Sequence, residues 1–62
     1  MELKVGMMYS SKWFNGLCTV LSIDEPNNEL RVHIDRETGS HEETWNLQHT
    51  IWGFENKDYI KG

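Results

Sequence analysis

LCTVLSIDEPNNELRVHID, residues 17–35, holds two β-rich segments separated by a tight turn. In its second half, LRVHID, apolar and polar residues alternate strictly, which predicts a strand with one buried and one wet face. In its first half, Val20 and Leu21 are adjacent, so we expect either two apolar faces or a bulge that resets the phase. Between them, Pro26 and two asparagines predict a turn. The chain must therefore reverse at residues 25–28.

Two further strands flank this stretch. Alternating apolar residues predict a first strand over residues 3–9. After a turn at ETGS, residues 37–40, the segment 41–47 is expected to return as a strand with Trp45 and Leu47 pointing inward.

The pattern changes period after residue 47. Leu47, Ile51 and Phe54 follow helical spacing, Asn46 can cap a helix and Gly53 can end one, so we expect a short helical or 3₁₀ turn near residues 47–53. The polar tail could add a short closing strand or fray.

These elements predict a single all-β domain over residues 1–62, a small and strongly bent five-stranded barrel. Closure would remove the exposed strand edges that promote aggregation. A two-layer α+β fold is the alternative, disfavoured because no segment keeps helical periodicity beyond about eight residues.

The order of motifs resembles the Tudor branch of the SH3-like barrels. Cys18 precedes Val20 in the predicted second strand, as that pattern requires, and the spacing of Val32, Asp35 and Gly39 fits its later part, with an acidic residue following. The resemblance spans roughly residues 5–50 and implies an SH3-like barrel.

The aromatic cage of Tudor domains that bind methylated lysine or arginine is not implied here. Its first aromatic typically stands directly before the second strand, where this chain has Asn15 and Gly16. Such Tudor domains also carry an aromatic residue in the turn directly after an aspartate. That residue is missing here, because Arg36 follows Asp35.

Charge and cysteine content restrict the class of protein. Six Lys and Arg against ten Asp and Glu give a net charge of −4, and the cations are scattered, which makes tight nucleic-acid binding unlikely to be the function. The single cysteine, Cys18, cannot form an intramolecular disulfide. With no signal-peptide pattern and no long apolar run, we expect a cytoplasmic protein with no membrane role.

No motif points to catalysis, a cofactor or a metal. The chain has no nucleophile elbow or P-loop, so we expect a protein that is not an enzyme. His33, His41 and His49 are spaced by eight residues, which matches no common zinc pattern.

Aromatic residues are the most informative candidates for a site. We assign Trp45 and Phe54 to the core, and expect Tyr9 to be buried with a wet hydroxyl. The candidate ligand contacts are then Phe14, Trp13 and Trp52, with Tyr9 as a fourth.

The conformation of the segment SKWFNG, residues 11–16, determines which of Trp13 and Phe14 packs into the core and which is exposed. A two-residue hairpin turn at Asn15 and Gly16 would set Trp13 opposite Cys18, facing the core, and would leave Phe14 outside. The alternative is a loop folded over the barrel end with both rings covering the core. We favour Trp13 for the fold and Phe14 for contact.

The sequence thus predicts a non-enzymatic protein-interaction module that binds a peptide or a basic protein partner through exposed aromatics. A homo-oligomeric structural or accessory protein without a small ligand is the first alternative. A nucleic-acid-binding barrel is the second, and it would require Lys12, Arg31 and His33 to gather on one face.

Overall fold

The computed structural model describes residues 2–62, which form five strands and one helix. Met1, included in the domain predicted over residues 1–62, lies outside the described residues. In chain order the elements are β1 (Met8–Ser11), β2 (Leu17–Asp24), β3 (Glu29–Arg36), β4 (Gly39–Asn46), α1 (Leu47–Glu55) and β5 (Tyr59–Lys61). The protein is mostly β, as the sequence predicts.

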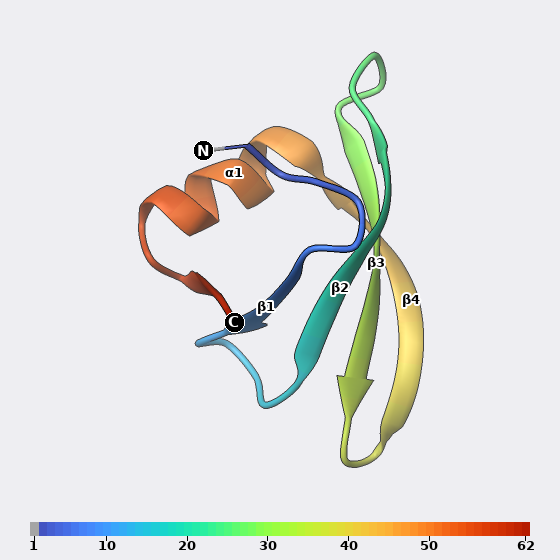
Figure 1. Ribbon diagram of the computed structural model, residues 1–62, viewed down its shortest axis with the longest axis vertical. Helices are drawn as coiled ribbons and strands as arrows, with labels where there is room; N and C mark the ends of the chain where they lie inside the picture. The colour runs from blue at the N-terminus through green and yellow to red at the C-terminus, as the bar shows by residue number, and fades with distance from the viewer. Residues whose placement is uncertain (1) are drawn as a thin grey trace.

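The strands form one antiparallel sheet in the order β4-β3-β2-β1-β5 (Figure 1). The predicted closure of this sheet is not observed: within residues 2–62, β4 and β5 are its two edges and do not pair with each other. Instead, α1 connects the two edge strands and packs against β3, β4 and β5 (Figure 1). The helix, rather than strand pairing, covers the open side of the sheet.

The β2–β3 hairpin confirms the predicted bulge. Val20 pairs with Val32, and the register then shifts so that Ser22, not Leu21, pairs with Arg31. The extra residue resets the side-chain alternation, so that Val20 and the half-buried Ile23 both face the core although they are three residues apart.

The turn at residues 25–28 also forms as predicted. Asn28 has a φ of 55°, a conformation that asparagine tolerates better than most residues. Its backbone carbonyl accepts a hydrogen bond from the N–H of Leu47 (2.9 Å), and its side-chain oxygen accepts one from the N–H of Gln48 (3.0 Å). The turn therefore anchors the start of α1.

The first strand begins later than predicted. In place of a strand over residues 3–9, β1 starts at Met8, because Gly6 has a φ of 89° and interrupts the extended chain. The N–H of Met7 donates to the carbonyl of Lys4 (3.1 Å) across this turn. As a result Val5 is exposed, although it is in phase with the buried Leu3 and Tyr9.

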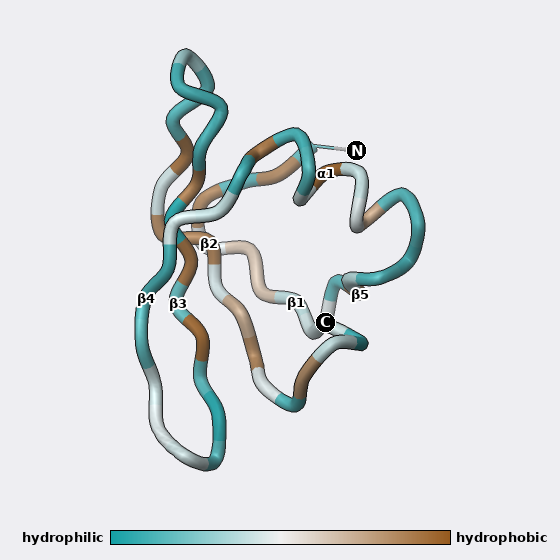
Figure 2. The backbone as a smooth tube through the Cα atoms, turned by 180° about the vertical axis from the view of Figure 1, so that it is seen from behind, coloured by the Kyte–Doolittle hydropathy of each residue, from teal (hydrophilic) through white to brown (hydrophobic). Residues whose placement is uncertain are grey.

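The core lies between the inner face of the sheet and the helix. It consists of Leu3, Tyr9, Cys18, Val20, Leu30, Val32, Ile34, Leu47 and Phe54. Figure 2 shows apolar segments recurring along β2 and β3, whereas β4 is hydrophilic along most of its length. In β4 every residue except the half-buried Trp45 is exposed.

The helix confirms the predicted cap but not the predicted end. The side-chain oxygen of Asn46 accepts a hydrogen bond from the N–H of His49 (2.8 Å), as expected of an N-cap. Gly53 lies inside α1 rather than after it, and the chain turns out of the helix near Lys57, where φ is 64°. The tail then pairs with β1 as β5, so it forms a short strand instead of fraying, but it does not close the sheet. No helix within residues 2–62 is long and apolar enough to cross a membrane.

Candidate functional site

Two of the aromatic residues predicted as contacts are on the surface. Trp13, in the loop between β1 and β2, is 66% exposed, and the Lys12 ammonium lies 4.9 Å from the centre of its ring. Trp52, on α1, is 54% exposed and packs edge-on against the ring of His49. Among the described residues, no ring contact joins Trp13 to Trp52. The predicted contacts thus do not form one cluster of rings.

The assignment of Trp13 to the fold and Phe14 to the surface is wrong. Tyr9, not Trp13, pairs with Cys18, so β1 ends at Ser11 and residues 12–16 form a loop instead of a two-residue hairpin turn. Phe14 is half-buried against the core, with the Arg36 guanidinium 4.3 Å from its ring centre. The alternative prediction, a loop that folds over the end of the sheet, therefore describes Phe14 but not Trp13.

Gly16 has a different role from the one expected. A Cβ at this position would lie 3.0 Å from the backbone carbonyl oxygen of Asp35 and 3.1 Å from Cγ of Arg36. Glycine is needed because the loop approaches the end of β3 closely, and not because a hairpin turn demands it.

Tyr9 is a core residue without an exposed surface. The expected wet hydroxyl is wrong: its oxygen is buried and has no hydrogen-bond partner within residues 2–62. Burial, and then the neighbouring Cys18 and Tyr59, raise the pKa of Tyr9 well above its ordinary value. Tyr9 cannot contact a ligand unless the core opens.

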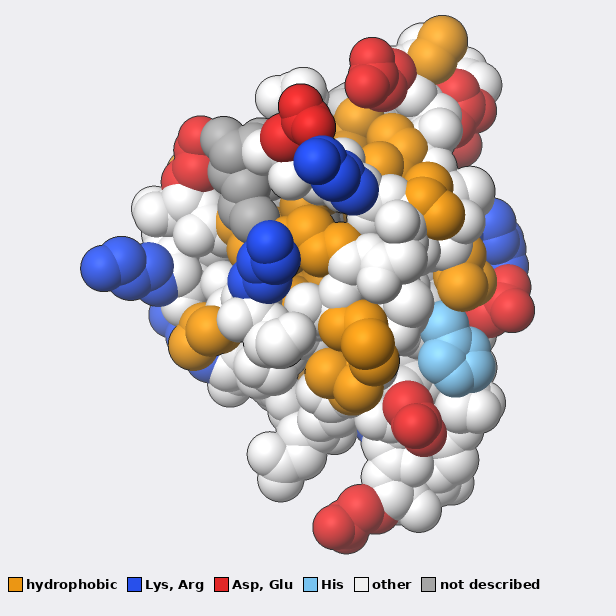
Figure 3. Space-filling view, in the orientation of Figure 1, with side chains coloured by type: hydrophobic (Ala, Val, Ile, Leu, Met, Phe, Trp, Pro, Cys, Tyr) orange, Lys and Arg blue, Asp and Glu red, His pale blue; other side chains and the backbone are white. Residues whose placement is uncertain are grey.

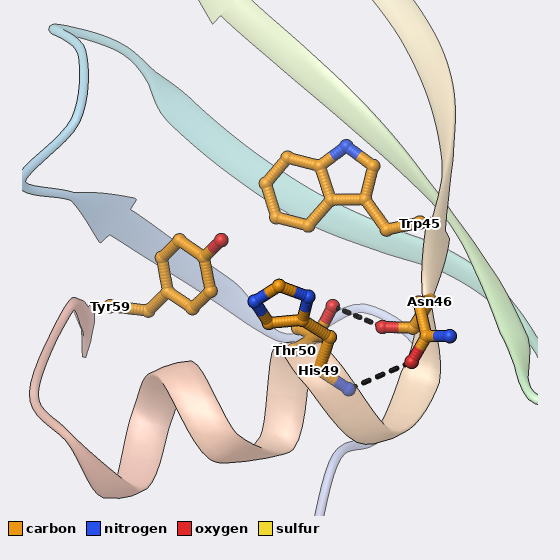
Figure 4. A pocket seen from close by; sticks show the side chains of 5 residues that line it. All are labelled: Trp45, Asn46, His49, Thr50 and Tyr59. Carbon is orange, nitrogen blue, oxygen red and sulfur yellow. Dashed lines mark hydrogen bonds between the residues drawn. The ribbon is translucent and has the colours of Figure 1, made fainter.

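An aromatic pocket lies where β4, α1 and β5 meet. We use this name for the hollow of about 200 Å³ lined by Trp45, Asn46, His49, Thr50 and Tyr59 (Figure 4). In Figure 4 the rings of Trp45 and Tyr59 stand on its two sides, while His49 and Thr50 rise from the helix between them. Small-molecule pockets measure about 300–1,000 Å³, so this hollow suits a single side chain better than a larger ligand.

Local contacts fix the walls of the aromatic pocket. The rings of Trp45 and Tyr59 are stacked, with centroids 5.6 Å apart and planes 29° from parallel. Tyr59 lies over Gly53, where a Cβ would stand only 2.5 Å from Cε2 of its ring. The missing side chain of Gly53 therefore allows Tyr59 to reach Trp45. On the helix side, the Thr50 hydroxyl donates to the Asn46 carbonyl (2.8 Å).

A carboxylate is bonded to Trp45, one of the rings that line the aromatic pocket. The indole N–H of Trp45 donates to Oε1 of Glu43 (2.9 Å), and Nε2 of His41 lies 2.6 Å from the other carboxylate oxygen. The hydrogen bond from Trp45, followed by that of His41, lowers the pKa of Glu43 below its ordinary value. The aromatic rings thus stand beside a negative charge at neutral pH.

The other hollows and reactive groups are weaker candidates for a functional site than the aromatic pocket. A hollow of about 500 Å³ is lined by Glu2, Lys4, Met7 and Lys61, none of which is aromatic. Cys18 is buried and unpaired by any disulfide, and burial raises the pKa of its thiol. In the part of the chain that the structure describes, no group of three or more His, Cys, Asp or Glu could hold a metal ion.

The outer face of the sheet carries exposed apolar side chains away from the aromatic pocket. Leu17 and Leu21 of β2 alternate with the buried Cys18 and Val20, so they point away from the core. Ile60 pairs with Ser10, next to Leu17, on the same face. Figure 3 shows apolar side chains separated by polar ones on the face seen there, with carboxylates gathered near the β2–β3 turn.

No family model, curated protein or solved structure matches this chain. The aromatic pocket therefore has to be interpreted from its own geometry.

Sequence reasoning missed the residues of the aromatic pocket. Trp45 was assigned to the core, which is half correct because its ring is partly buried and contacts Tyr9. Tyr59 lies in the polar tail, for which the sequence predicts only a short closing strand or a frayed end. One signal was present: Glu43 and Trp45 share a strand face, so an acidic residue stands beside a large ring.

Proposed function

We propose that this protein is a non-enzymatic interaction module that holds a side chain of a basic protein or peptide partner in the aromatic pocket. The observation that carries the proposal is the stacked pair of Trp45 and Tyr59 beside the ionised Glu43. Ring faces attract a cation by about 0.5–2 kcal/mol per contact, and the carboxylate bonded to the Trp45 indole adds to this attraction. The net charge of −4 favours the same kind of partner.

The fold relationship belongs to the same proposal. We infer a partly open SH3-like barrel of the Tudor-like type. Its support is the five-stranded antiparallel order β4-β3-β2-β1-β5, the bulge in β2 and the late helix that spans the sheet edges. Such a barrel commonly serves as a scaffold for interaction sites, whose chemistry depends on the residues grafted on it.

The three tryptophans allow a test that resolves the site. In ¹⁵N-labelled protein, the indole N–H signals of Trp13, Trp45 and Trp52 report three separate surface positions. We expect a short lysine-rich peptide to shift the Trp45 signal in a saturable manner, and a glutamate-rich peptide of the same length to leave it unchanged. If neither peptide shifts any indole signal, the proposal is wrong.

A pair of matched variants separates the aromatic pocket from the exposed rings. Trp45→Phe keeps a ring but removes the N–H bonded to Glu43, and it should weaken lysine-peptide binding several-fold, by about 1 kcal/mol. Trp13→Phe should have no effect. The opposite result would assign the contact to the exposed Trp13 predicted from sequence.

A second candidate function is self-association through the outer face of the sheet. The exposed Leu17, Leu21 and Ile60 favour it, since apolar groups gain by leaving water. Sedimentation velocity at low and high protein concentration tests this candidate. A concentration-independent monomer would exclude it, whereas a dimer that Leu21→Lys dissociates would support it.

A further inference from the structure

The outer edge of β4 is the longest unpaired strand edge in the described chain. β4 pairs with β3 over eight consecutive residue pairs without a bulge, and its other side pairs with no strand within residues 2–62. Natural edge strands are usually shielded by proline, lysine, a bulge or very short length. β4 has no proline, lysine or bulge, and the charges that it carries are those of Glu42 and Glu43, whereas the opposite edge, β5, has three residues and ends at Lys61.

The backbone of such an edge can bind another strand. In an antiparallel pair, alternate residues turn their N–H and C=O groups toward the partner strand, so the remaining residues of β4 turn theirs outward. Apart from the Asn46 carbonyl, which accepts from Thr50, none of the loop, cap or side-chain hydrogen bonds within residues 2–62 involves a backbone group of β4. The outward groups are therefore available to a partner.

The free edge leads directly to the aromatic pocket. Trp45 is the second-last residue of β4, and Asn46, its last residue, also lines the pocket. Glu43 stands two residues before Trp45, a distance of roughly 7 Å along a strand. A segment paired with β4 would thus pass the carboxylate and bring one of its side chains to the stacked rings.

The charges of β4 indicate which kind of segment could pair with its free edge. Its middle residues, Glu42 and Glu43, point to opposite faces of the sheet, and both have a pKa below the ordinary value, held down by Arg31 and Trp45 respectively. A second copy pairing symmetrically about Glu42 or Glu43 would set that glutamate opposite its own copy, and like charges directly opposite destabilise a strand pair. A strand that bears lysine or arginine would instead meet a carboxylate on each face: Glu43 beside Trp45, and Glu42, which already pairs with Arg31.

We propose that the free edge of β4 adds an extended, lysine- or arginine-bearing segment of a partner protein as a sixth strand, with one side chain entering the aromatic pocket. This inference rests on the proposed function and names how the partner is held. Main-chain hydrogen bonds supply affinity in such strand addition, and the alternate side chains supply specificity.

Backbone N-methylation tests the strand pairing directly. The probe is a peptide of alternating lysine and valine, as long as β4, with two methylated versions: one on every lysine amide and one on every valine amide. A strand added to an edge uses only one alternate set of its N–H groups. We therefore expect one methylated version to lose at least about tenfold in affinity and the other to bind within about twofold of the parent.

The nuclear magnetic resonance signals separate failure of this inference from failure of the proposed function. If both methylated versions bind like the parent and shift the Trp45 indole, side-chain recognition stands and strand addition is wrong. If both lose affinity equally, the edge is not used as proposed. If the parent peptide does not bind at all, the proposed function fails together with the inference.

Charge-matched variants give an independent check. The double variant Glu42→Gln with Glu43→Gln should weaken binding of the parent peptide at least about fivefold. The double variant Glu2→Gln with Glu25→Gln changes the net charge equally at two residues outside β4. It should lower the logarithm of the affinity by less than about half as much. Equal losses would mean that only net charge matters and would overturn the assignment to β4.

Discussion

At the residue scale, Gly53 and Tyr59 show how a missing side chain shapes the surface. Glycine within a helix costs about 1 kcal/mol relative to alanine, so its presence in α1 calls for a compensating reason. The ring of Tyr59 provides one, because it occupies the space that a Cβ would fill. The cost in helix propensity is offset by the contacts of Tyr59 with Trp45, Tyr9 and Phe54.

The Gly53→Ala variant tests this explanation. On helix propensity alone it should stabilise the protein by about 1 kcal/mol. Because the added Cβ displaces the Tyr59 ring, we expect net destabilisation of about 1–3 kcal/mol in urea unfolding, with a shift of the Trp45 indole signal. Glu55→Ala, at an exposed position of the same helix, is the control. A more stable Gly53→Ala variant would contradict the proposed close packing.

A second prediction at this scale concerns the buried hydroxyl of Tyr9. The folded state holds the pKa of Tyr9 above its ordinary 10.0, whereas the unfolded chain loses this proton near 10.0. Above that pH the unfolded state binds fewer protons than the folded state, so the stability falls as pH rises, by at most about 1.4 kcal/mol per pH unit for this group. Below that pH the group adds no pH dependence.

The Tyr9→Phe variant isolates this effect. At pH about 8 its stability should equal or slightly exceed that of the parent, because the lost hydroxyl has no hydrogen-bond partner in the described chain. Between pH about 8 and about 11 its urea-unfolding free energy should fall less steeply than that of the parent. A residual decline is expected because burial also raises the pKa of Cys18 and of Tyr59. Parallel pH profiles would contradict the role given to Tyr9.

At the scale of elements, two asparagines hold the start of α1. Asn46 caps the helix through the N–H of His49, and Asn28 binds the N–H groups of Leu47 and Gln48 from the β2–β3 turn. A helix of nine residues is too short to be stable alone, so these contacts and its packing keep it in place.

Removal of the cap should destabilise the protein measurably. We expect Asn46→Ala to lower the unfolding free energy by about 1 kcal/mol, because one N–H at the helix start loses its acceptor. Asn46→Ser should restore most of this loss, since serine also caps well. Urea unfolding and hydrogen exchange at the His49 amide provide the measurements. Equal stability of the alanine and serine variants would show that the cap is not important here.

At the scale of the whole molecule, the distribution of charge argues against a nucleic-acid interface. Lys12 forms an ion pair with Asp58 (2.8 Å), and Arg31 forms one with Glu42 (2.8 Å). Arg31 and His33 do share the outer face of β3, but the carboxylate bonded to Arg31 offsets its charge there. Phosphate binding generally needs several cations on one surface.

We therefore expect no gel shift with single- or double-stranded DNA or RNA at low salt, where phosphate attraction is strongest. A shift that the double variant Lys12→Ala with Arg31→Ala abolishes would contradict this prediction. The protein would then fit the nucleic-acid-binding alternative.

Local chemistry in the sequence determined most of the hairpin framework. The alternation in residues 30–35, the adjacent Val20 and Leu21, the turn at residues 25–28 and the cap at Asn46 all gave the structure that forms. In each case the signal lies within a few residues of the feature that it predicts. Strand phase, turn chemistry and capping are short-range effects, so a single sequence can reveal them.

Contacts between distant segments decided the rest. Gly6 breaks the alternation of the first strand, and pairing of Tyr9 with Cys18 places Trp13 outside and Phe14 against the core. The aromatic pocket forms only because β5 brings Tyr59 over Gly53 and against Trp45. Periodicity cannot show which of several rings fills a given space, because that depends on packing between elements that only the folded chain brings together.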